Sequence, residues 1–162
     1  AKNLIRQLMT FAKGGDPLKE TISVSDVITH AEALVPQETG IARVWDVEED
    51  LWAADLDVSQ ITQVFQNLII NAGYVTESEG KVDIRIVRND GFLKVSVTDK
   101  GCGIPEDVQG YLFKDTLTTK KDGNGLGLLS CKGIIEENHQ GKLWFETEVG
   151  KGTTFHFTLP AH

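Results

Sequence analysis

A long amphipathic segment, from about Asp57 to Val75, restricts the fold more than any other part of this chain. Its apolar side chains recur every three or four residues, which is the period of a helix with one broad apolar stripe. Asp57 and Gln60 have the spacing of a capping box at the start of such a helix. The stripe consists of Val58, Ile61, Val64, Phe65, Leu68, Ile69 and Ala72. The segment therefore predicts a helix with one buried side.

Four later segments alternate apolar and polar residues, which is the period of half-buried strands. Residues 82–87 and 92–98 flank Asn89-Asp90-Gly91, and this turn sequence between alternating segments predicts a hairpin. Residues 142–147 and 153–159 alternate in the same way around a glycine-rich turn near the end of the chain. Two antiparallel strand pairs are therefore expected.

Shorter elements complete the prediction. A short strand pair is expected from residues 41–47 (IARVWDV) and 51–54 (LWAA). A long loop, interrupted by a short helix after Pro105, is expected over residues 99–125. Helices mixed with mostly antiparallel strands predict an α+β fold, a two-layer α/β sandwich.

Two more helices are expected. Ser25 with Asp26 predicts the cap of a helix that Pro36 ends. A helix from about Leu126 to Asn138 follows the long loop, with Gly141 just beyond it.

Bulk composition limits the class of partner. The 162 residues suit one domain with a real core. A net charge of −8 argues against a general nucleic-acid or anionic-membrane surface, although a local site can still bind an anion. Cys102 and Cys131 lack metal-ligand spacing and fit a reducing cytosol, and no signal peptide or membrane-length apolar run is present.

The first residues differ from the remainder. Residues 1–13 have helical apolar spacing and local basic charge, and Gly14-Gly15-Asp16-Pro17 ends the pattern. We expect residues 1–15 to be the tail of a neighbouring domain plus a linker, and residues 16–162 to be a separate domain. With no initiator Met, the chain is expected to be a fragment of a longer protein.

Three polar features could carry chemistry, and the first is a row of amides. Gln63, Asn67 and Asn71 are four residues apart, so they share one edge of the long helix beside its apolar stripe. They either bond to backbone at the sheet margin or face a polar ligand or the water shell of a metal. Mg²⁺ retains several waters and takes few protein oxygens, which two Asn carbonyls can supply.

The second feature is VTDKGCGIP, residues 97–105, where an alternating strand ends at Asp99. Gly101 and Gly103 let the backbone come close to a ligand, and the aspartate can accept a hydrogen bond from an amino group such as that of adenine. A plain Asp-Gly turn leaving a strand is the alternative.

The third feature is DGNGLGL, residues 122–128, with glycines at every second position before a helix. Free N–H groups and the positive helix end there suit an anion, and Thr119 and Lys120 lie just upstream as side-chain donors. A flexible loop explains the glycines equally well. The spacing is not the dinucleotide fingerprint.

The order of these features resembles the catalytic ATP-binding domain of bacterial sensor histidine kinases, in the Bergerat-type ATPase superfamily. The matching motifs are NLIINA (67–72) for the N box, DKGCGI (99–104) for the first glycine box, LFKDTLTTK (112–120) for the F-box and lid, GNGLGL (123–128) for the second glycine box and GKGTTF (150–155) for the closing motif. The resemblance covers roughly residues 18–160. It implies the Bergerat fold with an ATP lid over about 105–125.

The resemblance also implies roles for individual residues. Asp99 should bind adenine, and Asn67 and Asn71 should hold Mg²⁺ and the phosphates of ATP or ADP. Gly123, Gly125 and Gly127 should form the lid hinge and phosphate-facing end, with Lys120 as a phosphate contact. The remaining nucleotide-binding residues that it implies are Tyr74, Gly101, Gly103, Ile104, Thr119, Leu126, Leu128 and Thr153.

Asn67 distinguishes the branches of this superfamily. Hydrolytic members carry a Glu there as general base, and an amide cannot take that proton. By resemblance we expect a cytoplasmic kinase domain whose γ-phosphoryl group goes to a histidine of the adjoining dimerisation domain, and then to a response-regulator receiver domain. The parent protein should be a homodimer. The acceptor histidine is expected to be absent here, because the resemblance puts it upstream of the helix that residues 1–13 resemble. None of the four histidines in the chain is followed by an acidic residue.

Two departures from the family pattern keep alternatives open. Tyr74 stands where many of these kinases carry a phosphate-facing polar or basic residue, and Asp115, Thr116 and Leu117 replace the usual Pro-Phe-Phe of the F-box. A non-catalytic nucleotide-binding module and a hydrolytic ATPase of the same fold are therefore the competing hypotheses.

Overall fold

The computed structural model describes residues 15–34, 42–49, 53–75, 80–110, 112–113 and 126–161. The helix predicted for residues 1–13 and most of the predicted lid lie outside the described residues.

A five-stranded sheet forms one layer of the domain. Its strand order is β2-β4-β5-β7-β6, with β2 parallel to β4 and every other pair antiparallel. The strands are β2 (Ala42–Val47), β4 (Lys81–Asn89), β5 (Phe92–Asp99), β6 (Leu143–Glu148) and β7 (Gly152–Pro160). Both predicted hairpins are confirmed. Asp90 and Gly91 have φ values of 48° and 82°, so the β4–β5 turn has the positive-φ pair that suits the twist of a hairpin.

The predicted pairing of residues 41–47 with 51–54 is wrong. β2 pairs with β4 instead, and β3 (Ala54–Leu56) pairs antiparallel with β1 (Glu20–Ile22) in a separate two-stranded sheet. The inward side chains of β2 explain the difference, because Trp45 packs on Phe65 at 5.8 Å between ring centroids and Arg43 binds Glu32 at 3.1 Å. Contacts with the helices thus place β2 at the sheet edge.

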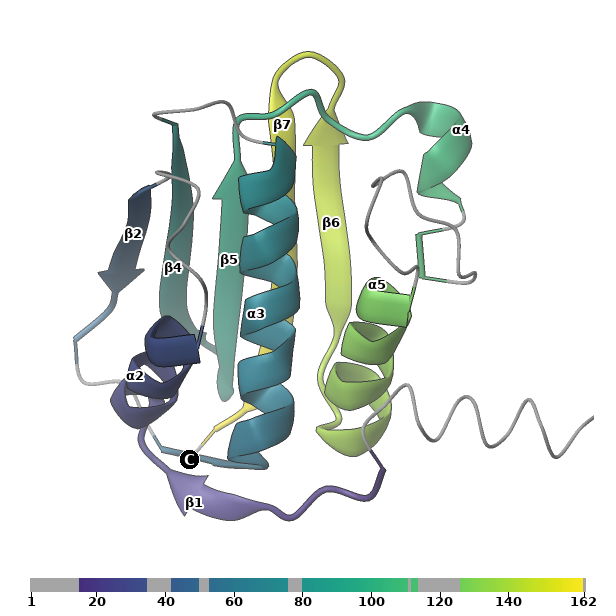
Figure 1. Cartoon of the computed structure of the whole chain (residues 1–162). Coiled ribbons are helices and arrows are strands. Elements are labelled where there is room, and N and C mark those ends of the chain that lie inside the picture. Colours follow the sequence, from purple (N-terminus) through teal and green to yellow (C-terminus); the bar gives the residue numbers. More distant parts are fainter. Residues whose placement is uncertain are drawn as a thin grey trace, which may run out of the picture.

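Helices form the second layer, on one face of the sheet (Figure 1). They are α2 (Val24–Leu34), α3 (Val58–Val75) and α5 (Leu126–Lys132), which continues into the π-helix η1 (Gly133–Asn138); the short α4 (Glu106–Gln109) follows Pro105. Ser23, rather than Ser25 with Asp26, begins α2, since Ser23 Oγ accepts from the Asp26 N–H at 3.4 Å. None of the described helices is both long and apolar enough to cross a membrane.

The core lies between α3 and the sheet. Six of the seven predicted stripe residues of α3 are buried, and Val58 is half-buried against them. Phe65 is central, because its ring packs on Trp45 from one edge strand and on Phe157 of β7 at 5.4 Å. Burial of this apolar area is the main force holding the two layers together. The expected α+β two-layer sandwich is confirmed.

At the start of α3, the structure confirms one hydrogen bond of the predicted capping box and replaces the other. Asp57 Oδ1 accepts from the Gln60 N–H at 3.1 Å, as predicted. The Asp57 N–H, however, donates to His139 Nε2 at 3.0 Å. The Gln60 side chain instead contacts Gly15 and Asn138. The end of η1 therefore helps to cap α3.

Candidate functional site

Asp99 ends β5 as a nearly buried carboxylate. Its Oδ1 accepts from the Gly101 N–H at 2.9 Å and from the Thr153 N–H at 3.3 Å. Burial raises the pKa of Asp99, and these two N–H groups partly oppose the rise because they favour the charged form. Since both bonds reach Oδ1, Oδ2 is the oxygen left to accept a hydrogen bond from a ligand.

Glycines let two loops close around this aspartate. A Cβ on Gly103, whose φ is 77°, would lie 2.5 Å from the Glu148 carbonyl oxygen, and a Cβ on Gly152 would lie 2.2 Å from the Asp99 carbonyl oxygen. Neither position accommodates a side chain. The Gly150 N–H also donates to the Cys102 carbonyl at 2.8 Å. The loop after β5 is thus held against the β6–β7 turn.

Hydroxyl groups continue the site behind Asp99. Thr147 Oγ1 lies 2.8 Å from Thr153 Oγ1 and accepts from the Ile104 N–H at 2.9 Å. Asp99, Thr147 and Thr153 line a pocket of about 400 Å³. Thr147 was not predicted as a site residue. Its alternation within residues 142–147 and its position opposite Thr153 in the hairpin are the signals that could have identified it.

The predicted amide row of α3 faces the first turns of α5. Gln63 Nε2 donates to Ser130 Oγ at 3.0 Å, and Asn67 Nδ2 lies 3.4 Å from the Gly127 carbonyl oxygen and 3.6 Å from Cys131 Sγ. Asn71, half-buried, follows one turn later along the same edge. For the side-chain nitrogen of Asn67, the structure therefore agrees with the alternative that these amides bond to backbone. Its carbonyl oxygen is the atom that suits a metal ion.

Aromatic packing fixes Phe113, which lies within the predicted lid. Phe113 packs on Phe145 at 5.8 Å and on Phe155 at 6.3 Å between ring centroids, and Lys132 Nζ lies 5.3 Å from the Phe113 ring centre. Leu128 of α5 is half-buried against the core, as is Ile104. One end of the lid region is thus attached to the sheet.

Several predicted site residues cannot be placed. Thr119, Lys120, Gly123 and Gly125 lie outside the described residues, as do the side chains of Tyr74 and Leu126. Gly127 is described, and a Cβ there would meet Asn67 only at 3.8 Å. Contact with Asn67 alone therefore does not require glycine at that position.

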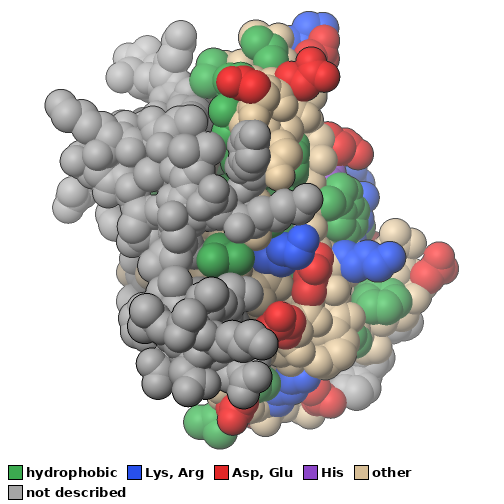
Figure 2. Space-filling model, turned by 90° about the vertical axis from the view of Figure 1, so that its right-hand side faces the viewer, with side chains coloured by type: hydrophobic (Ala, Val, Ile, Leu, Met, Phe, Trp, Pro, Cys, Tyr) green, Lys and Arg blue, Asp and Glu red, His purple; other side chains and the backbone are tan. Residues whose placement is uncertain are grey.

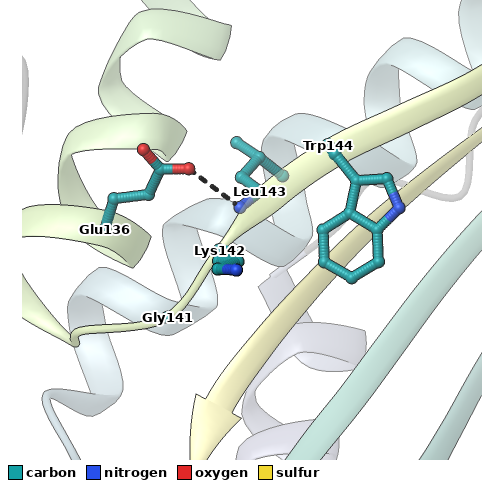
Figure 3. A pocket seen from close by; sticks show the side chains of 5 residues that line it. All are labelled: Glu136, Gly141, Lys142, Leu143 and Trp144. Carbon is teal, nitrogen blue, oxygen red and sulfur yellow. Dashed lines mark hydrogen bonds between the residues drawn. The ribbon is translucent and has the colours of Figure 1, made fainter.

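A second pocket, of about 670 Å³, lies away from Asp99 between η1 and β6 (Figure 3). Glu136, Lys142 and Trp144 are among its lining residues. Glu136 Oε2 already accepts from the Leu143 N–H at 3.1 Å, and Lys132 Nζ lies 3.9 Å from its other oxygen. We assign no ligand to this pocket. On the face of the molecule in Figure 2, the described acidic and basic side chains are interspersed.

A buried strand-end carboxylate, a glycine-held loop and an asparagine edge facing a second helix thus lie together on this α/β sandwich. Residues 56–162 match the family described as histidine kinase-, DNA gyrase B-, and HSP90-like ATPase, and the chain belongs to this family.

The curated relatives are longer proteins that are named as kinases. The chain is 34% identical over 161 residues to sporulation kinase A of Bacillus subtilis (strain 168), which covers 97% of this chain and 26% of that protein. It is 37% identical over 122 residues to the adaptive-response sensory kinase SasA of Synechococcus sp. (strain JA-2-3B'a(2-13)), covering 72% of this chain and 32% of that protein. The chain thus spans about a third or less of these relatives.

Solved structures show the same fold. The nucleotide-free catalytic domain of histidine kinase ThkA aligns with a TM-score of 0.78 and 30% identity, over 88% of this chain and 95% of that one. Full-length ShkA in complex with AMPPNP aligns with a TM-score of 0.79 and 27% identity, over 95% of this chain and 34% of that one. The fold is that of a histidine kinase catalytic domain.

Proposed function

We propose that this domain binds MgATP at the Asp99 site and transfers the γ-phosphoryl group to a histidine of an adjoining dimerisation domain. The observation that carries the proposal is the Asp99 carboxylate, buried at the end of β5 with only Oδ2 left for a ligand. A carboxylate so placed accepts one hydrogen bond and rejects acceptors, which matches the exocyclic amino group of adenine.

Asn67 and Asn71 would hold Mg²⁺ through their side-chain oxygens. The Asn67 contacts fit this role, because α5 engages its nitrogen and leaves the hard oxygen donor that Mg²⁺ prefers. The ion would neutralise the phosphate charge during transfer. An amide at position 67 cannot act as a general base toward water, which favours transfer over hydrolysis.

Residues of the lid would complete phosphate binding. Thr119 and Lys120 would donate to the phosphates, Tyr74 would contribute its hydroxyl, and Gly123, Gly125 and Gly127 would allow hinge motion and close approach. The first turn of α5, with Leu126 and Leu128, follows that hinge. Gly101, Gly103, Ile104 and Thr153 would frame the base. A closed lid would exclude water from the reacting groups.

The partners of the parent protein follow from its relatives. Histidine kinase ThkA has been solved in complex with the response regulator protein TrrA, and that kinase aligns with this chain at a TM-score of 0.75 and 28% identity. We infer that a receiver domain takes the phosphoryl group here as well. Residues 1–15 would be the end of the dimerisation helix plus linker, residues 16–162 the catalytic domain, and the parent a homodimer. Because ATP is its substrate, we place this domain in the cytoplasm.

Calorimetric titration of ATP, with and without Mg²⁺, tests the nucleotide site directly. Asp99→Asn keeps an oxygen for Gly101 and Thr153 but turns an amide donor toward the adenine amino group. Loss of a hydrogen bond to a charged group costs about 1.5–3 kcal/mol, so affinity should fall about 10- to 150-fold. Asp46→Asn, an isosteric change in the exposed ion pair with Arg85, is the matched control.

The outcomes separate the competing functions. Unchanged affinity in Asp99→Asn would refute the adenine assignment. Binding without phosphoryl transfer in the longer protein would favour a non-catalytic nucleotide module. Steady phosphate release by the isolated domain would favour a hydrolytic ATPase.

A further inference from the structure

The start of the described chain is bound by two buried amides. The Gly15 carbonyl oxygen accepts from Gln60 Nε2 at 3.2 Å and from Asn138 Nδ2 at 3.1 Å. The two amides also bond to each other, since Asn138 Nδ2 donates to Gln60 Oε1 at 2.9 Å. Gln60 is 4% exposed and Asn138 5% exposed. A buried amide network of this kind requires its partners in place, because unpaired amides are costly.

The residues that follow Gly15 are held by the same end of the domain. The Leu18 N–H donates to Asp57 Oδ2 at 2.8 Å, and Lys19 Nζ donates to Gln140 Oε1 at 2.9 Å. Backbone from Gly15 to Leu18 is thus tied both to the first turn of α3 and to the end of η1. Leu18 itself is 85% exposed, so apolar burial of its side chain does not fix this segment. Polar contacts fix it.

The two amides belong to the two helical segments that lead to the ATP site. Gln60 precedes Asn67 and Asn71 on α3, which puts them about 10 and 16 Å further along one rigid helix. Asn138 ends η1, which continues directly from α5 and the Gly127 contact with Asn67. In Figure 1 both helical segments have one end beside β1. The linker is therefore attached to the far ends of the elements that carry the site.

We propose that Gln60 and Asn138 are positioning residues for phosphoryl transfer, which fix the linker at Gly15 and so set where the preceding domain stands relative to bound ATP. This inference rests on the proposed function. The two amides touch neither nucleotide nor acceptor; they act through the linker. Transfer depends mainly on holding donor and acceptor in line, and a misplacement of about 1 Å can cost about 100-fold in rate.

The hydrogen bonds of Gln60 and Asn138 with Gly15 and with each other form a clamp on the linker. Two variants remove these bonds in different ways. Asn138→Asp is isosteric and removes both donated hydrogen bonds, and Gln60→Met keeps the length of the side chain without donor or acceptor. Glu137→Gln, the converse exchange at the exposed neighbouring position, is the matched control. Urea unfolding and ATP titration of each variant of this chain establish that the fold and the nucleotide site are retained.

Phosphoryl transfer in the full-length protein is then compared with transfer in trans to a separate acceptor domain. In the full-length protein the clamp variants should lower kcat about 10- to 100-fold with KM for ATP unchanged. Transfer in trans should be unaffected, because the linker no longer joins donor to acceptor. Unchanged kcat in the full-length protein, or an equal fall in both formats, would overturn the proposal.

If the wild-type protein transfers no phosphoryl group at all, that result alone refutes the proposed function. Amide hydrogen exchange still tests whether Gln60 and Asn138 hold the linker. The Leu18 N–H should be protected in the wild type and in Glu137→Gln. It should exchange at least tenfold faster in Asn138→Asp and Gln60→Met. Equal protection in all four proteins would show that the two amides do not hold the linker.

Discussion

Replacing His139 with leucine should destabilise the domain through the polar groups it leaves behind. His139 is 2% exposed, and its Nε2 accepts from the Asp57 N–H at 3.0 Å. The proton therefore lies on Nδ1, which donates to the Ile134 carbonyl oxygen at 2.8 Å. His139→Leu fills a similar volume but satisfies neither group.

The magnitude follows from these two contacts. An unpaired buried N–H at Asp57 costs about 1–3 kcal/mol, and the lost bond at Ile134 about 0.5–1.5 kcal/mol. A loss of about 1.5–4.5 kcal/mol is therefore expected, against a typical domain stability of about 5–15 kcal/mol. Urea unfolding at neutral pH measures this loss. His30→Leu, at an exposed position of α2, should change stability by less than about 0.5 kcal/mol.

The same histidine should make stability depend on pH. Burial lowers the pKa of His139 from its ordinary value of 6.5, so the folded state resists protonation that the unfolded state accepts. The contribution of His139 is complete above pH 6.5 and is lost as pH falls through the lowered pKa. His156 adds a similar dependence, because burial and Lys94 lower its pKa as well. His139→Leu should flatten the profile without abolishing it. A wild-type profile that is flat below pH 6.5, or a destabilisation under about 1 kcal/mol, would refute the reasoning.

Three further outcomes are expected. Gly103→Ala should lower the melting temperature by several degrees, at about 1–3 kcal/mol, because its Cβ meets the Glu148 carbonyl; an unchanged melting curve would contradict the packing described for the loop. ATP affinity should fall as pH is lowered through the raised pKa of Asp99, since the protonated carboxyl no longer serves as a pure acceptor, and Asp99→Asn should remove that dependence in calorimetric titrations. Asn67→Ala should weaken MgATP binding roughly tenfold or more while changing Mg²⁺-free binding less; equal losses in both titrations would exclude metal coordination by Asn67.

Much of the fold is encoded within short windows of sequence. The apolar stripe of α3, the Asn89-Asp90-Gly91 turn and the end of β5 at Asp99 were each predicted and are confirmed. Periodicity and turn chemistry decide such features locally, because a residue's neighbours three or four positions away determine whether a stripe or an alternation exists. The glycines around Asp99 were identified on the same basis.

Local sequence patterns did not decide which strands and polar groups pair with one another. The pairing of β2 with β4, the cap that His139 supplies to Asp57 and the contact of Asn67 with α5 each join residues far apart in the chain. No local pattern distinguishes an edge strand that pairs in parallel from an edge strand that forms a hairpin. Nor does a local pattern show whether the Gln60 side chain closes a capping box or binds the linker. Sequence alone determined most of the elements and the residue types of the candidate site. Only the tertiary structure decided which polar groups meet, because burial forces each of them to find a partner and packing settles which one lies within reach.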